Sequence, residues 1–525
     1  MAVLHVVVLS ALGLVVFGAK LIRRRRFYTN LFPPNTAIAT FYTEIAQKYN
    51  LTETGLFYLD LWPFGPSQMI LVSPEAAELV TAAESYPLHD KVREYLTPLL
   101  GKDAIGAADG EKWKELHQML APAFRPVKTK GMAGVIAELV RELLCPALHR
   151  YAGSGEVFSM ERCAAQLVFA ISSRVILGEG VSAEENACLL ADLNHVVEYA
   201  TTLALTTATN PLVKVGRWWQ KRAAIRRMDS FLQSSVRGCM ARIVQRKSNG
   251  GAAGSTILDT ILVNAQRAQC DPRNPASLKP EFVRVVSDNL KGLLLGGYGT
   301  TADTLCYVFI MLALHPTVVQ NLRTEHDQVF GSDPETIMDM LQSTPHKLNE
   351  LHYTTAVIKE TLHLFPVGFN ARKEKPGSPT LTYKGTAYPT TNQTIIPTIH
   401  TIHYDAGVFP HPTKFDPARF LPRSHEAQTQ TPPAKAWRPF ERGPRACPGR
   451  DLAMDELRII LLLTAREFVF ECAGVEVEVG RRPAAGVPRA LHTDLDLLMG
   501  DLAFQEMGFS AKARGGSIMR VRCAA

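Results

Sequence analysis

Phe440-Glu-Arg-Gly443-Pro-Arg445-Ala-Cys447-Pro448-Gly449 surrounds the most informative cysteine of this 525-residue chain. Its two glycines permit a tight loop in which the backbone approaches the cysteine sulfur closely. Pro448 and Gly449 open a helix that we expect over residues 450 to about 467, so the positive end of this helix faces the sulfur. Such surroundings favour a thiolate, the form of cysteine that binds a metal. The loop therefore predicts Cys447 as the axial ligand of a haem iron.

This pattern, Phe-x-x-Gly-x-Arg-x-Cys-x-Gly, resembles the haem-binding loop of the cytochromes P-450, the haem-thiolate monooxygenases. The resemblance implies a mainly α fold with small β-sheets (α+β), in which a triangular helical body contains a long central helix. It implies haem b as the cofactor, with Cys447 as iron ligand and with contacts from Phe440, Gly443, Arg445 and Gly449. We expect Arg445 to neutralise a haem propionate. A small buried hydrophobic residue is the alternative for any cysteine, and it is what we expect of the other eight.

The composition is typical of a large helix-rich protein in a reducing environment. Hydrophobic residues make up 46% of the chain, which supplies ample core. The nine cysteines are odd in number and form no Cys-x-x-Cys pair, which argues against a disulfide framework or a zinc site. The net charge of +7 includes four arginines in a run at residues 23–26. No basic patch interleaved with aromatic residues suggests a nucleic-acid partner, so we expect none.

The N-terminus predicts a membrane anchor. Residues 2–19 form an apolar stretch interrupted by His5 and Ser10, and about 20 apolar residues span a bilayer as a helix. A cleaved signal peptide would need positive charge before the apolar core, whereas here the charges follow it. The positive-inside rule then leaves the rest of the chain in the cytoplasm. We expect a transmembrane anchor at 1–22, a basic, proline-containing linker at 23–34 and the haem-thiolate monooxygenase domain at 35–525, on the endoplasmic reticulum membrane.

The resemblance extends over residues 35–525 in the family's order. A helical stretch at 35–49 precedes an alternating, strand-like stretch at 55–62, and 69–72 is expected to be its partner strand. Ser73-Pro74-Glu75 has the N-cap and the first-turn proline of a helix. Loops are expected at 248–255 and 424–433, which are rich in small and polar residues.

A long helix is expected over residues 280–315, ended by Pro316. Its middle, Gly296-Gly-Tyr-Gly299-Thr300, contains three glycines, and each costs about 1 kcal/mol relative to alanine in a helix. Close helix packing is one explanation. The other is the family's oxygen-binding groove, in which Gly297 lies at the cofactor and Thr300 is the catalytic alcohol that helps to deliver protons. Gly299 occupies the usual acid position and Asp303, one turn further along, cannot simply replace it, so water or another group must carry the protons.

A second motif departs from the family by having histidine where arginine is usual. Glu360-Thr-Leu-His363 resembles the Glu-x-x-Arg motif, which in the family joins Arg419 of Asp-Pro-Ala-Arg-Phe in a buried network behind the haem. A histidine ring has two nitrogens against the five donors of arginine, so we expect a weaker network. An ordinary surface ion pair on a helix is the alternative.

A third motif, in the N-terminal half of the chain, also has histidine where arginine is usual. Trp113-Lys-Glu-Leu-His117 resembles the Trp-x-x-x-Arg pair that holds a haem propionate, with His117 as a less charged donor. Arg372 matches a strand arginine that usually contacts a propionate. These departures could reduce haem retention.

The closest resemblance is to membrane-bound fungal enzymes of secondary metabolism, suggested by residues 436–440 and 503–507. It implies NADPH- and O2-dependent hydroxylation or oxidation of a lipophilic small molecule. Electrons would come from a separate NADPH–haemoprotein reductase, because the chain contains no nucleotide or flavin fingerprint. Its docking surface is expected at Lys435, Arg438, Arg442 and Arg450.

Two alternatives remain open. A redox-neutral haem-thiolate enzyme of rearrangement or dehydration is supported by Gly299. A membrane-anchored haem-binding pseudoenzyme is supported only by His117 and His363. We expect the substrate pocket to be formed by residues 86–109, 200–219, the central helix near Leu295 and residues 509–516.

Overall fold

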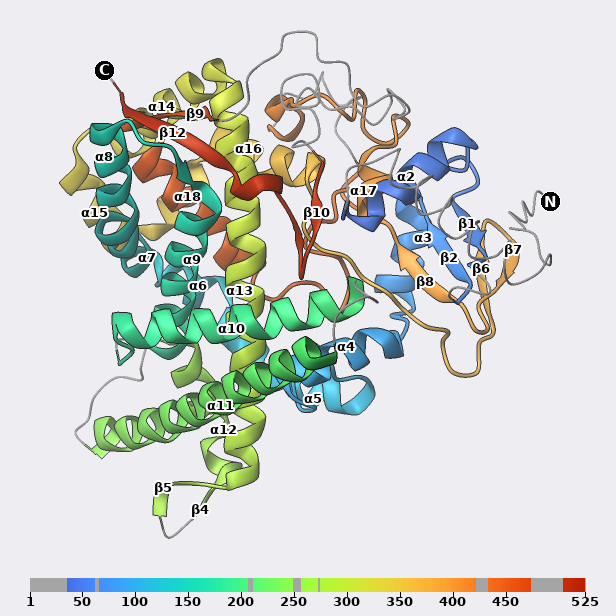
Figure 1. Ribbon diagram of the computed structural model, residues 1–525, viewed down its shortest axis with the longest axis horizontal. Coiled ribbons are helices and arrows are strands. Elements are labelled where there is room, and N and C mark those ends of the chain that lie inside the picture. Colours follow the sequence, from blue (N-terminus) through green and yellow to red (C-terminus); the bar gives the residue numbers. More distant parts are fainter. Residues whose placement is uncertain are drawn as a thin grey trace.

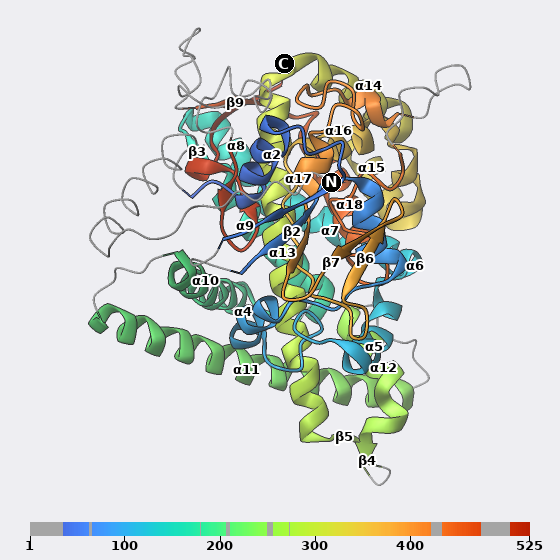
Figure 2. The same cartoon turned by 90° about the vertical axis from the view of Figure 1, so that its right-hand side faces the viewer.

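Helix α13 (Pro280–Leu314) runs through the middle of the helical body, and the other helices pack around it (Figure 1). Its residues from Leu305 to Leu312 are all buried. The helix packs against α9 (Met160–Leu177), α16 (His352–Leu364) and α18 (Arg450–Thr464), and α11 (Pro211–Ser248) crosses it (Figures 1 and 2). The predicted central helix is thus confirmed to within one residue at its end.

This computed structural model describes residues 35–61, 66–178, 180–205, 211–248, 256–271, 274–421, 433–473 and 504–524. The predicted anchor and linker, the loop at 249–255 and residues 424–432 lie outside this part of the chain. Within it, α13 is the one helix long and apolar enough to cross a membrane, and it is mostly buried, as a core helix is. The cysteines whose side chains are described are all free.

Helix boundaries follow from local sequence. Ser73 Oγ accepts a hydrogen bond from Ala76 N (3.1 Å) at the start of α3 (Pro74–Glu78), as predicted. Gly101, with φ of 103°, ends α4 (Asp90–Leu100). The other helices are α2 (Ile38–Lys48), α5 (Gly110–Leu120), α6 (Pro126–Lys130), α7 (Ala133–Leu139), α8 (Cys145–Ser154), α10 (Ala183–Leu205), α12 (Ile257–Gln269), α14 (Pro316–Phe330), α15 (Pro334–Ser343) and α17 (Ile399–His403).

The strands form small separate sheets. The predicted β-strands belong to a sheet of β1 (Leu56–Leu59), β2 (Gln68–Leu71) and β8 (Thr394–Pro397). This sheet lies on the side of the molecule away from α8, α14 and α15 (Figure 1). β1 and β2 are antiparallel, as predicted, with Leu56 opposite Leu71, and β8 adds a parallel neighbour. The other strands are β3 (Phe158–Ser159), β12 (Ile518–Cys523) and β9 (Phe468–Cys472) in one sheet, and the pairs β4 (Cys270–Asp271) with β5 (Asn274–Leu278), β6 (Thr380–Tyr383) with β7 (Thr386–Pro389), and β10 (Glu506–Met507) with β11 (Ala511–Lys512). The mainly α fold with small sheets is confirmed.

Candidate haem site

The cysteine loop is shaped by its own backbone and by the π-helical turn Leu79–Ala83, which follows α3. Cys447 N donates to Phe440 O (2.8 Å), and Ala446 N donates to Gly443 O (3.0 Å). Gly443 has φ of 84°, and a Cβ there would lie 2.2 Å from the Thr81 backbone oxygen, so the loop requires glycine at this position. Gly449 is the N-cap of α18, which ends three residues before the predicted 467, at Thr464. The loop and the start of the helix are therefore as the sequence predicts.

The Cys447 side chain is exposed to solvent, yet the protein around it desolvates the thiol and raises its pKa. A backbone N–H bond from Gly449 and the charge of Arg450 act in the opposite direction but are smaller. The predicted effect of the helix end is thus present, because both groups lower the pKa of the thiol, although desolvation is the larger effect. A coordinating metal cation would stabilise the thiolate further.

Two arginines, Arg372 and Arg445, lie close enough that the charge of Arg445 lowers the pKa of Arg372. Arg372 is 1% exposed, and its Nε has no hydrogen-bond partner, while its Nη1 donates to Tyr86 O (3.2 Å). Burial lowers the pKa of Arg372 to about 10, and the neighbouring charge of Arg445 adds to the effect. A buried cation with an unused donor beside a second cation fits an anionic group.

The ring of Trp113 connects this cation pair to α5. The Arg445 guanidinium lies 4.8 Å from the Trp113 ring centroid, and the His117 ring stacks on Trp113 at 4.9 Å. Asp109, which the sequence analysis did not assign to the site, accepts a hydrogen bond from Arg445 Nη2 (2.5 Å) and caps α5 by accepting from Gly110 N (3.0 Å). Its position in the sequence, just before the helix that contains Trp113, is the feature from which its role could have been predicted. The structure therefore brings four of the predicted cofactor residues together.

These residues fit a haem group. The Cys447 thiol is exposed, and Arg372 has an unused buried donor of the kind that a propionate accepts from. The specific contacts predicted for Trp113, His117, Arg372 and Arg445 stay predictions.

The predicted network behind the loop is present and fully buried. Glu360 Oε2 lies 3.2 Å from Arg419 Nε and 3.3 Å from His363 Nδ1, and the three side chains are 0 to 5% exposed. Asp416 N also donates to Glu360 Oε1 (2.9 Å). A surface ion pair is therefore excluded.

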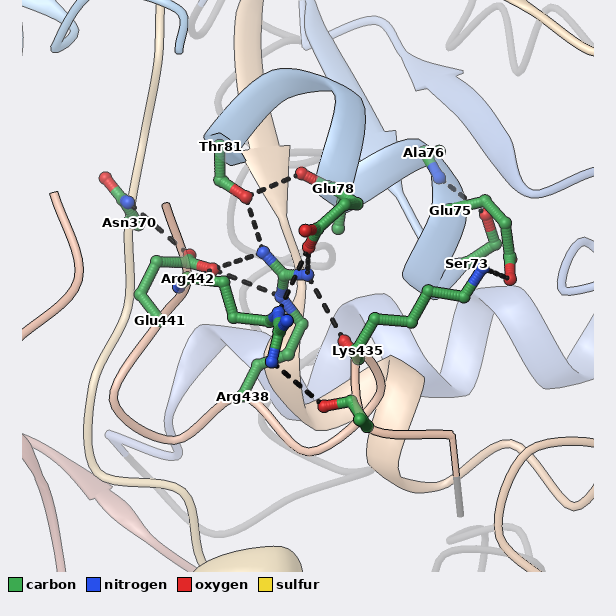
Figure 3. Close-up of polar contacts among 12 residues, drawn as sticks. Ser73, Glu75, Ala76, Glu78, Thr81, Asn370, Lys435, Arg438, Glu441 and Arg442 are labelled. Atoms are coloured by element: carbon green, nitrogen blue, oxygen red, sulfur yellow. Dashed lines mark hydrogen bonds and ion pairs between the residues drawn. The ribbon is translucent and has the colours of Figure 1, made fainter. Parts of the chain in front are cut away.

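The predicted docking surface needs a correction at Arg438. This side chain is 0% exposed and pairs with Glu78 (3.0 Å) and Glu441 (2.5 Å), while its Nη2 donates to Thr81 Oγ1 (Figure 3). It ties the cysteine loop to the Thr81 segment and cannot face a partner protein. Its acidic partner Glu78 lies 360 positions away in sequence, so the pattern of positive charges alone was misleading.

The three other predicted docking cations are closer to the surface. Lys435 and Arg442 are 40% and 38% exposed, and they pair with Glu75 (2.6 Å) and Glu78 (3.2 Å). Arg450 is exposed.

The glycines of α13 serve different purposes. A Cβ on Gly297 would lie 2.9 Å from Ser172 Oγ of α9, so helix packing already explains this glycine, and its predicted role at the cofactor stays a prediction. Nothing lies within 4 Å of a Cβ on Gly296 or Gly299. Thr300 Oγ1 donates to Gly296 O (2.8 Å) and is partly exposed. The helix continues through the three glycines without a break.

A cavity of about 1370 Å³ borders the same stretch of α13. Its walls come from α9, α10, α13 and the C-terminal residues around β10 and β11, and Gly299 lies in its lining. Leu295 and Phe509, which belong to two of the four segments predicted to form the substrate pocket, lie in its lining, and their role in a substrate pocket stays a prediction. Its described lining residues include neither Thr300 nor Cys447.

Comparison with known proteins agrees with this geometry. Residues 33–485 match the family Cytochrome P450. Cytochrome P450 monooxygenase acrF of Aspergillus aculeatus is 31% identical over 495 residues, which cover 91% of this chain and 96% of that protein. Cytochrome P450 monooxygenase polC of Polytolypa hystricis is 29% identical, over 86% of this chain and 80% of that protein. The crystal structure of the cytochrome P450DA heme domain superposes with a TM-score of 0.70 at 19% identity, covering 93% of this chain and 94% of that one, which shows the shared fold. The chain belongs to the cytochrome P450 family and is an oxidoreductase of the monooxygenase type.

Proposed function

We propose that this chain is a membrane-anchored monooxygenase that oxidises a lipophilic small molecule in fungal secondary metabolism, using O2 and NADPH through a separate reductase. The cysteine loop is the observation that carries the proposal, since it presents an exposed thiol at Cys447 and brings Arg445 near Arg372, whose buried Nε has no hydrogen-bond partner. The similar fungal proteins are named monooxygenases, and the apolar N-terminal stretch supports an anchor. Bound haem would supply oxygen activation and transfer of one oxygen atom.

The protein's own residues would bind and orient. Cys447 would hold the cofactor from one side, and Arg372 with Arg445 would neutralise its carboxylates. Thr300 Oγ1 donates to Gly296 O (2.8 Å), which holds the hydroxyl in place while its lone pairs can accept a hydrogen bond from water. Because Gly299 brings no carboxyl, we propose that water or another group carries the protons.

The test is the amount of product formed per NADPH consumed, after reconstitution with a reductase and candidate substrates. Thr300→Ala should keep the haem content but lower this ratio several-fold, with the lost electrons appearing as hydrogen peroxide. Thr300→Ser, which retains a hydroxyl, should keep most of the wild-type ratio. An unchanged ratio in Thr300→Ala would reduce the threonine to a packing residue. Product formation without NADPH and O2 would favour the redox-neutral alternative that Gly299 suggests.

A further inference from the structure

Two histidines behind the cysteine loop, His363 of α16 and His403 of α17, bond to each other's backbone. Both are 0% exposed, and their ring centroids are 5.4 Å apart. His363 Nε2 lies 2.9 Å from His403 O, and His403 Nδ1 lies 2.9 Å from His363 O. Each carbonyl accepts, so each of these two ring nitrogens must donate. The reciprocal bonds join α16 to α17.

The second nitrogen of His403 determines its protonation state. Arg438 N donates to His403 Nε2 (3.2 Å), so this nitrogen carries a lone pair and not a proton. With one nitrogen facing an acceptor and the other a donor, the His403 ring is neutral with its hydrogen on Nδ1. Burial lowers the pKa of His403 well below its usual range, in agreement with a neutral ring.

The second nitrogen of His363 faces the opposite kind of atom. His363 Nδ1 lies 3.3 Å from Glu360 Oε2 and has no hydrogen-bond partner in the described structure. A neutral ring with its proton on Nε2 would direct the Nδ1 lone pair at a buried carboxylate, which is repulsive. A ring protonated on both nitrogens would satisfy the His403 carbonyl and the carboxylate together.

The surroundings of His363 supply both signs of charge. From the elements packed against it, the titratable groups that face it are Glu360 on its own helix, His400 and His403 of α17, and Arg419 of the short helical turn Pro417–Phe420. The Phe409 ring stacks on it at 4.4 Å and keeps water away. The nearest anion is Glu360, which Arg419 shares.

We propose that charged His363 and neutral His403 form a positioning pair that holds the cysteine loop in place. The chain of contacts runs from the Glu360 carboxylate through His363 and His403 to Arg438 N. The Arg438 side chain then bonds Glu441 inside the loop, and Phe440 O accepts from Cys447 N (2.8 Å). Neither histidine touches the reacting atoms. This inference rests on the proposed function, because its effect is on how the loop retains haem.

The pair gives the protein a pH dependence that arginine in place of His363 would not. Loss of the second proton from His363 removes the attraction to Glu360 and leaves a lone pair against the carboxylate. The loop should therefore hold its thiolate less well once His363 has lost this proton. An arginine at this position would keep its charge and would not show this loss.

The experiment uses membranes that contain the full-length holoprotein. Two quantities are measured as a function of pH: the thiolate-type shift of the reduced carbon-monoxide spectrum and the rate of haem release. The variants are His363→Arg, His363→Gln and the control His326→Gln. His326 of α14 is also 0% exposed and bonds Thr354 Oγ1 (2.9 Å), but it has no described contact with the loop. We expect a fall of the thiolate signal with pH in the wild type and His326→Gln, and no such fall in the two His363 variants. His363→Gln should also release haem about tenfold faster or more at acidic pH, because it leaves Glu360 with one cation fewer.

The outcomes separate this inference from the proposed function. A wild type without the thiolate-type spectrum would overturn the haem assignment itself. A wild type that shows the spectrum but shares its pH profile with His363→Gln would overturn only the histidine pair. If His363→Arg does not accumulate, the comparison of His363→Gln with His326→Gln still decides the matter.

Discussion

Gly443 is the most constrained single residue of the cysteine loop. Its φ is 84°, and an added Cβ would lie 2.2 Å from Thr81 O and 2.6 Å from Ala82 Cα, both backbone atoms that cannot rotate away. Gly443→Ala should lower the free energy of unfolding by roughly 3 kcal/mol or more and release haem. The control is Gly385→Ala in the β6–β7 turn, where φ is 76° and nothing lies within 4 Å, so only about 1–2 kcal/mol of backbone strain is expected. Equal losses in denaturant unfolding would contradict the close approach to Thr81.

Asp303 gives a prediction for pH dependence. Ser510 Oγ donates to its carboxylate, and burial raises the pKa of Asp303 to about 7, with Glu161 raising it further and Lys512 lowering it. The folded protein thus holds this proton more tightly than the unfolded chain, so the contribution to stability is present below about pH 4 and is lost as pH rises to about 7. Asp303→Asn should remove this loss. Between about pH 4 and 7, the unfolding free energy of Asp303→Asn minus that of the wild type should grow with pH, by at most roughly 1.4 kcal/mol per pH unit. If the two proteins instead show parallel curves of unfolding free energy against pH, the burial of Asp303 would be contradicted.

For single residues, the sequence predicts a role correctly where the interacting residues lie close together in the chain. Cys447, Gly443 and Arg445 belong to one short loop, where turn geometry and ligand chemistry act over a few positions. Asp109 and the burial of Arg438 were not predicted, because their partners come from distant segments: Arg445 lies 336 positions from Asp109, and Arg438 lies 360 positions from Glu78. Charge sequence alone does not distinguish a solvated arginine from a buried, paired one.

Among the structural elements, the packing of α13 on α9 makes Gly297 and Gly299 differ. Gly297→Ala would place Cβ 2.9 Å from Ser172 Oγ, and Ser172 is itself buried, so we expect a loss of about 1 kcal/mol or more in unfolding free energy. Gly299→Ala has nothing within 4 Å and should raise the same free energy by about 1 kcal/mol, because alanine favours a helix. Denaturant midpoints measure both. The reverse order would mean that Gly297 does not face α9.

Element boundaries were predictable where strong local signals exist. Proline at each end defines α13, and alternating side chains define β1 and its pairing with β2. The parallel pairing of β2 with β8, more than 300 residues later, has no local signal, because it depends on how the chain returns to the sheet. The end of α18 was expected three residues too late, since no proline follows it.

For the whole molecule, the N-terminal anchor can be tested by truncation. The described body begins at residue 35, and Ala37 N bonds Gln505 O (2.9 Å), which ties this end of the body to its C-terminal part. Removal of residues 1–26 should shift much of the protein to the soluble fraction of lysed cells while the haem spectrum is retained. Mature wild-type protein beginning after Ala19 would instead indicate a cleaved signal peptide.

The most direct test of the haem assignment for this molecule is the reduced carbon-monoxide difference spectrum of Cys447→Ser beside that of the wild type. Cys145→Ser serves as the control, because Cys145 is a buried free cysteine in α8. The wild type and the control should show the shifted absorption of a thiolate-ligated haem, and Cys447→Ser should lose it, because an alcohol does not supply the thiolate's electron density to the iron. A Cys447→Ser protein that keeps the shifted absorption would contradict the assignment of Cys447 as the haem ligand.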